Sequence, residues 1–151
     1  MASGKGNTNA AGILQAIYQA VFTDLSNVLA NSSSSQITNI YISLHTANPG
    51  ATGTQSTSEA TYGGGTGYAR QPVVRSAVGW TLTGETITNA AVINFGACVG
   101  GTGETETYVG VGTLVSGAGT LLWFGSLTTP LAVSGGITPS IAIGALSITE
   151  A

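Results

Sequence analysis

The sequence predicts an all-β fold, a jelly-roll-like β-sandwich with one N-terminal amphipathic α-helix. Two patterns carry this prediction. Near the N-terminus, apolar residues recur every three or four positions, as on one face of a helix. From residue 40 onward, short segments rich in Val, Ile, Thr and aromatic residues alternate with glycine, at a spacing typical of sandwiches and barrels. We expect strands at 40–45, 70–78, 79–83, 87–95, 108–115, 121–127 and 137–148.

The helix is expected from Asn9 to about Ala30. Asn9 can cap its first turn through the side-chain oxygen, and Asn31 with the serines after it ends the helix, because these residues prefer local hydrogen bonds. The apolar stripe consists of Leu14, Ile17, Val21, Leu25 and Val28. The predicted organisation is a flexible arm over 1–8, the helix and a linker over 9–35, and one β-sandwich domain over 36–151.

A period of two marks the first strand. Ile40, Ile42 and Leu44 share one face, and His45 lies on the other. Further along, the glycines of segment 113–121 indicate a hairpin, because glycine supplies the positive φ that tight turns need. Two prolines, Pro130 and Pro139, are expected at sheet edges or strand ends, since proline donates no ladder hydrogen bond.

A long loop is expected over 47–67, where Pro49, several glycines and many Ser and Thr residues leave no periodic apolar face. Loops of this length usually carry function or contacts. Glu59 lies within the loop, and Arg70 and Arg75 follow it in one predicted strand. An Arg–carboxylate pair can hold the loop against the sheet, or either Arg can reach a neighbouring subunit. We favour the pair within the chain.

The chain is unusually poor in charge. Only 6% of its 151 residues are charged, against roughly a quarter in an ordinary soluble domain. With 42% hydrophobic residues it is expected to fold and to associate with copies of itself, because little repulsion keeps them apart. Three basic residues and a net charge of -3 argue against nucleic-acid and membrane partners. The N-terminus resembles no secretory signal, so we expect synthesis and assembly in the cytoplasm.

Few residues are suited to catalysis. His45 is the only histidine and Cys98 the only cysteine, and neither lies in a recognisable catalytic motif. We expect no enzyme, no cofactor and no metal ion. Instead, His45 is interpreted as a strand residue that holds the following loop by a hydrogen bond, and Cys98 as a small buried hydrophobe. The acidic pair Glu104 and Glu106 is expected to lie in water on a glycine-rich loop.

Three stretches form an LHT-x-x-PG, Glu, YAR pattern: Leu44-His45-Thr46-Ala47-Asn48-Pro49-Gly50, Glu59-Ala60 and Gly67-Tyr68-Ala69-Arg70. This pattern resembles a family of small tailed-phage virion proteins, often labelled tail-fibre-like or structural, and the likeness spans about 40–148. The resemblance implies a jelly-roll-like subunit, commonly trimeric, that binds the virion shell and has no catalytic residue. It also implies that His45, Pro49 and Arg70 shape the long loop.

Small size, low charge and the absence of a repetitive shaft lead us to expect a capsid decoration or cement subunit. Such a subunit would bind the major capsid protein on the outside of a phage head, through the N-terminal helix or the long loop. The main alternative is a tail-fibre, baseplate or receptor-binding component. A carbohydrate-binding module would need exposed aromatic residues, and for Trp80 and Trp123 we favour core packing.

Overall fold

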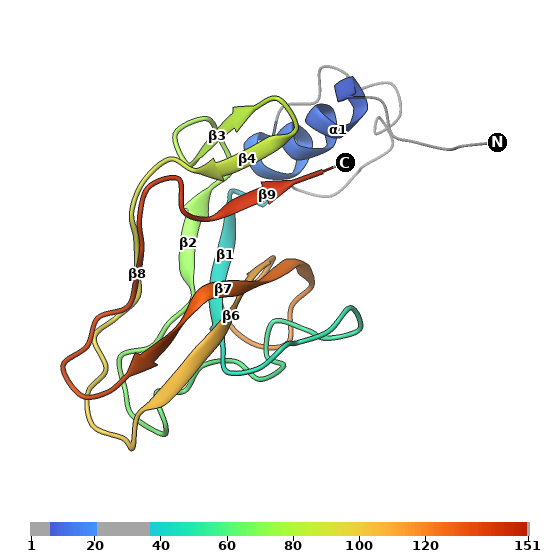
Figure 1. The fold of residues 1–151 in the computed structure, drawn as a ribbon. Helices are drawn as coiled ribbons and strands as arrows, with labels where there is room; N and C mark the ends of the chain where they lie inside the picture. Colours follow the sequence, from blue (N-terminus) through green and yellow to red (C-terminus); the bar gives the residue numbers. More distant parts are fainter. Residues whose placement is uncertain (1–6, 21–36, 151) are drawn as a thin grey trace. The chain divides into compact units, whose positions relative to one another are not determined.

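The computed structural model describes residues 7–20 and 37–150. Over these residues the chain is mostly β, with antiparallel sheets and one short N-terminal helix, which confirms the predicted all-β class (Figure 1). The helical part consists of α1 (Asn7–Leu14) and the π-helical turn η1 (Gln15–Gln19). The strands are β1 (Asn39–His45), β2 (Gln71–Val74), β3 (Trp80–Thr83), β4 (Thr86–Asn89), β5 (Ile93–Asn94), β6 (Glu104–Gly112), β7 (Leu121–Val133), β8 (Ser140–Ile141) and β9 (Ser147–Thr149).

The chain divides into two compact units. The first comprises Met1–Thr38, Val74–Ile93 and Ile141–Ala151, and the second comprises Asn39–Val73 and Asn94–Ser140. The strands form sheets of order β2-β1-β6-β7 and β3-β4-β9, with β5 and β8 as a separate pair. A single β-sandwich domain over 36–151 stays a prediction.

The sheet of the second unit is built around β1 and β6. These strands pair antiparallel, with Ile42 opposite Val111 and Leu44 opposite Val109, and all four side chains are buried. The alternation that predicted β1 is confirmed. From Ile42 to His45 every residue of β1 is buried, so polar side chains on its second face are covered too. That second face leads to the candidate site.

The predicted hairpin joins β6 to β7, which continues to Val133 as the edge strand of its sheet (Figure 1). The expected end at residue 127 is therefore too early. The ladder shifts register between Glu106 and Tyr108, and Pro130 lies in β7 near this irregularity. An edge position accommodates a proline because its missing N–H faces no partner strand, as the sequence predicted.

The first unit has its own core around Trp80, Ile87 and Ile148, which are fully or almost fully buried. The ring of Tyr18 meets the Trp80 indole edge-on, with centroids 4.7 Å apart. In addition, the Gln19 side chain donates a hydrogen bond to the Trp80 carbonyl. The described part of the N-terminal segment, residues 7–20, is therefore packed against β3 through Tyr18 and Gln19.

The helix ends earlier than predicted. Ala20 adopts the left-handed conformation at φ 55, which terminates η1, whereas the sequence predicted a continuous helix to about Ala30. Arg75 contributes to this end, because its guanidinium donates to the carbonyls of Ala16 and Ile17 and satisfies groups that the helix leaves unpaired. Val21, the rest of the stripe and the boundary at Asn31 lie outside the described residues. No helix in the described ranges is long and apolar enough to span a membrane.

Three predicted strands are shorter or interrupted. The expected strand 70–78 is limited to β2, and the segments 87–95 and 137–148 each contain two short strands. Asn89, the last residue of β4, has a buried side chain that bonds the backbone of the segments between β4 and β5 and between β8 and β9. Its amide donates to the carbonyls of Ala91 and Ala142 and accepts from the Leu146 N–H. A polar residue that serves as a bridge between two turns cannot be recognised from a strand pattern.

Candidate functional site

Backbone hydrogen bonds hold the loop 47–67 against the end of β1 at two points, Ser58 and Ala60. The Thr46 N–H donates to the Ser58 carbonyl, and the Ala60 N–H donates to the Leu44 carbonyl. At its start the Asn48 side chain accepts from the Gly50 N–H, and Gly50 has φ 73, a conformation that favours glycine. The predicted loop is confirmed, and it is anchored.

An ion pair fastens the loop from the other side. Arg70 Nε lies 2.6 Å from Glu59 Oε1, and its Nη2 donates to Glu59 Oε2 at 2.7 Å. The Arg70 side chain is only 2% exposed and that of Glu59 18%. The Tyr68 hydroxyl donates to the same carboxylate and accepts from the Leu44 N–H. Glu59, Tyr68 and Arg70 form what we term the loop clamp, and the pairing that the sequence favoured is present.

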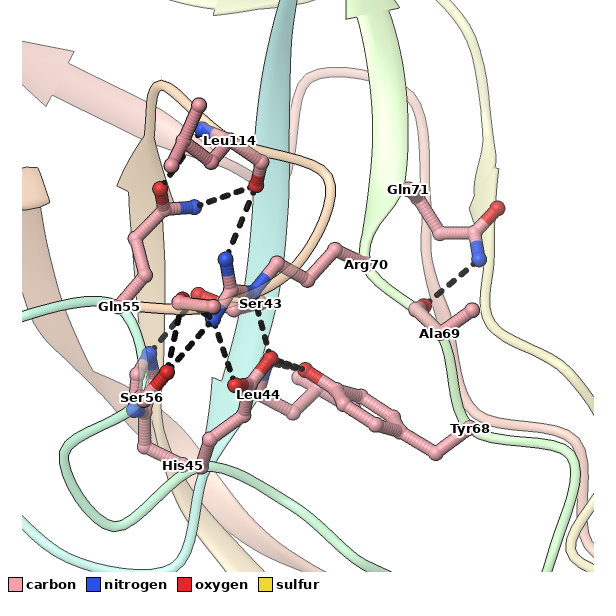
Figure 2. A network of polar contacts seen from close by, with 12 residues as sticks. Ser43, Leu44, His45, Gln55, Ser56, Tyr68, Ala69, Arg70, Gln71 and Leu114 are labelled. Atoms are coloured by element: carbon pink, nitrogen blue, oxygen red, sulfur yellow. Dashed lines mark hydrogen bonds and ion pairs between the residues drawn. The ribbon is translucent and has the colours of Figure 1, made fainter. Parts of the chain in front are cut away.

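The loop clamp also reaches the β6–β7 turn. Arg70 donates to the carbonyl of Leu114 at 3.0 Å, to that of Gly117 at 2.7 Å, and to the Ser56 hydroxyl (Figure 2). A planar guanidinium presents five donors in a fixed fork, which is why one side chain can hold two loops at once. The clamp thus joins loop 47–67 and turn 113–120 into one connected surface.

Gln55 makes a second link between the same two segments. Its side-chain amide accepts from the Leu114 N–H and donates to the Leu114 carbonyl (Figure 2). The backbone N–H of Gln55 donates to the Ala118 carbonyl. Gln55 is fully buried. Gly112 makes room for it, because a Cβ there would meet the Gln55 side chain at 2.1 Å. Glycine inside a strand often marks such a close approach.

His45 holds the middle of the loop. Its Nδ1 lies 2.8 Å from the Thr57 carbonyl, which can only accept, so Nδ1 carries the proton. Nε2 then accepts from the Ser43 hydroxyl at 2.8 Å. Burial lowers the pKa of His45, while the Thr57 carbonyl and the Glu59 charge act in the opposite direction. The predicted role for His45, a hydrogen bond to the following loop, is confirmed.

Acid is expected to weaken this anchor. A buried imidazole of lowered pKa takes up a proton less readily in the folded chain, so the contribution of His45 to stability falls as the pH drops below 6.5, the ordinary value. His45→Gln should lose about 1–3 kcal/mol of stability at pH 7, because buried partners are left unpaired. The difference in urea midpoint between wild type and His45→Gln should be smaller at pH 5 than at pH 7. A difference that does not change with pH would mean that the protonation of His45 has no part in the effect.

A second carboxylate anchors the far end of the loop. Glu104, at the start of β6, accepts hydrogen bonds from the N–H groups of Thr61 and Tyr62 and from the Thr61 hydroxyl. Although partial burial acts to raise it, the pKa of Glu104 is lowered by these backbone donors. Glu106, two residues on, is fully buried. The expectation that both carboxylates lie in water is wrong, because they belong to a strand and not to a loop.

The clamp borders an open depression of about 290 Å³. It is lined by Glu59, Ala60, Tyr68, Ala69, Arg70, Val115, Ser116 and Gly117. The donors of Arg70 and the hydroxyl of Tyr68 are engaged within the protein, and burial followed by the Glu59 charge raises the pKa of Tyr68 above its usual range. Within residues 7–20 and 37–150, no three His, Cys, Asp or Glu side chains are grouped to hold a metal ion.

A protein-family model described as Podophage GP4 fiber I protein gp80 matches residues 18–149. The chain belongs to this family. No curated protein matches the sequence. The family match confirms the predicted relation to tailed-phage virion structural proteins. It agrees with the tail-fibre alternative, while placement on the capsid stays a prediction.

In this fibre-family chain, the predicted site residues divide between the two units. His45, Pro49, Glu59 and Arg70 all belong to the anchored loop region of the second unit, where Pro49 is buried. Arg75 serves the first unit as a cap of η1. Of the apolar stripe, Leu14 is buried and Ile17 half-buried, and Val21 lies outside the described residues.

Sequence reasoning missed Gln55 as a site residue and gave Tyr68 no role in the clamp. A signal for Gln55 was present in the second half of β6, where Gly110 and Gly112 alternate with the apolar Val109 and Val111. Gly110 lies under the His45 and Ser43 side chains, just as Gly112 lies under Gln55. Two glycines at alternate positions of one strand face indicate that polar side chains cross that face closely.

Proposed function

We propose that this chain is a non-enzymatic structural component of a podophage tail fibre. The family match over residues 18–149 carries the proposal, because the matching family is described as a fibre protein. We therefore prefer the tail-fibre role, which was the main alternative in the sequence analysis, to the capsid cement role. Self-association, with the trimer that the resemblance implies, is part of it.

The clamped surface supports a role in contacts with other virion proteins. Loop 47–67 and turn 113–120 contain one charged residue, Glu59, and it is neutralised by Arg70. Leu114 and Val115 at the turn are 49% and 60% exposed. A rigid, uncharged surface with exposed apolar side chains loses little conformational entropy on binding and repels no neighbouring copy. We infer that this surface contacts another fibre component.

The fibre and cement roles differ in what fails when the chain is missing. Particles assembled without it are expected to keep heads as heat-resistant as those of wild type, and to adsorb to host cells poorly. Head stability is measured by release of packaged DNA on heating, and adsorption by counting unbound particles. Heads that release DNA at a lower temperature, with normal adsorption, would support the capsid cement role and contradict the fibre proposal.

A further inference from the structure

The two glutamates of β6 form an unusual pair. Glu106 is fully buried. Neither of its carboxyl oxygens has a hydrogen-bond donor among the described residues. Its carboxyl group contacts that of Glu104, which already accepts from Thr61 and Tyr62. Glu104 is half-buried, so Glu106 is the carboxyl group of the pair that has neither water nor a donor to stabilise its charge. A buried carboxylate in contact with a second, ionised carboxylate carries a large penalty, which protonation of Glu106 removes.

We propose that Glu104 and Glu106 share one proton, so that the Glu106 O–H donates to the Glu104 carboxylate and the pair forms a pH-sensitive clasp on the turn 61–63. The assignment of the proton follows from the partners. Glu104 faces three donors that favour its charged form, whereas Glu106 faces none. When Glu106 loses its proton to solvent, its charge meets that of Glu104 with no donor to offset it.

The turn held by the clasp is under backbone strain. Tyr62 has φ 56, a region that non-glycine residues rarely adopt, and its side chain is fully buried with the hydroxyl donating to Gly96. Gly63 packs against the backbone of Gly103, and the Thr102 N–H donates to the Gly63 carbonyl. The Glu104 hydrogen bonds help to hold this conformation, so weakening them should release the turn first.

Among the described residues, no basic group offsets the charge of Glu106, and the charged group that acts on it is Glu104 on β6 itself. The Tyr62 hydroxyl interacts with Glu106 and with the Cys98 thiol, and β7 contributes the apolar Leu131 and Val133. Burial, followed by hydrogen bonding and repulsion from Glu104, raises the pKa of Glu106 to about 8. Because the folded chain then binds this proton more tightly than the unfolded chain, stability falls as the pH rises from 4.5 towards 8.

Two measurements on the 151-residue chain test the proposal. Side-chain carboxyl carbon shifts in NMR should show one glutamate titrating near pH 8 in wild type, and its signal should vanish in Glu106→Gln. In urea, the unfolding constant of wild type relative to Glu106→Gln should rise by up to about tenfold per pH unit between pH 5 and 8. Glu85→Gln, which removes a carboxylate from the first unit, should retain the wild-type dependence.

Amide hydrogen exchange locates the clasp. In wild type, exchange of the Thr61 and Tyr62 amides should accelerate between pH 7 and pH 9 by more than the rise in their intrinsic exchange rates, which means that their protection falls. In Glu106→Gln, whose side-chain amide can donate at any pH, the protection should stay the same. Glu104→Gln should shift the Glu106 titration to lower pH, since it removes the neighbouring charge. If no glutamate titrates near neutral pH, or if Glu104→Gln leaves the titration unmoved, the proposal is overturned. Stabilisation of wild type by Ca²⁺, absent in Glu106→Gln, would overturn it in favour of a cation site.

Discussion

Replacing Arg70 with methionine is expected to lower the free energy of unfolding by about 3–5 kcal/mol, the usual loss when one partner of a buried pair is removed. The substitution leaves Glu59 largely buried without its cation, and it leaves the carbonyls of Leu114 and Gly117 without their donor. Methionine fills much of the same volume, so the loss reports on the polar contacts. Urea denaturation followed by tryptophan fluorescence measures it.

Matched variants separate the loop clamp from a general effect of removing a cation. Arg75→Met removes a guanidinium that bonds carbonyls alone, and should have a smaller effect because no buried carboxylate is stranded. Arg70→Lys keeps the charge but not the fork, and should be intermediate. In a double-mutant cycle, Arg70→Met and Glu59→Gln should be strongly non-additive. Additive effects would mean that the two side chains act independently, against the account of the clamp.

Trp80→Ala should destabilise the first unit by about 3–5 kcal/mol, because it removes a large buried side chain and leaves a cavity. Trp80 is inaccessible to solvent and meets the Tyr18 ring at 4.7 Å. The loss should appear as a lower unfolding midpoint in circular dichroism, together with faster amide exchange in η1, whose packing partner is gone.

Trp80→Phe is the matched control for that substitution. The indole N–H of Trp80 has no hydrogen-bond partner among the described residues, so phenylalanine loses volume without losing a hydrogen bond. Its effect should be less than half that of alanine. An equal loss for both variants would indicate that the indole N–H is bonded in solution, and would contradict the packing explanation.

The elements that the sequence predicted well are those where side-chain pattern and burial agree. Ile40, Ile42 and Leu44 alternate along β1 and are all buried, so a simple period of two was sufficient. The glycines of turn 113–120 likewise predicted the hairpin between β6 and β7, because their conformational freedom is a local property.

The errors arise where tertiary contacts override local preference. The N-terminal stripe continues past Ala20, yet the helix ends there, with Arg75 bonded to its last carbonyls from a distant part of the chain. A glutamate is usually an exposed residue, and only the burial pattern of β6 in the folded chain shows that Glu106 points inward. A sequence pattern records neither a partner far along the chain nor which carboxyl holds a proton.

The candidate site was predicted in part for the same reason. Arg70 and Glu59 were suggested because charges are so scarce that two of them close in sequence stand out. Gln55 was not, since a glutamine in a polar loop is unremarkable until its backbone partner at Leu114 is known. In a chain with few charges, buried neutral side chains therefore carry much of the loop geometry.

An asymmetric cryo-electron microscopy reconstruction of the virion tests the central claim, that this chain is a fibre component, most directly. Density for the β units is expected in the tail fibres, with loop 47–67 and turn 113–120 facing another fibre component. Density repeated over the capsid lattice and absent from the tail would contradict it, and would establish the cement role instead.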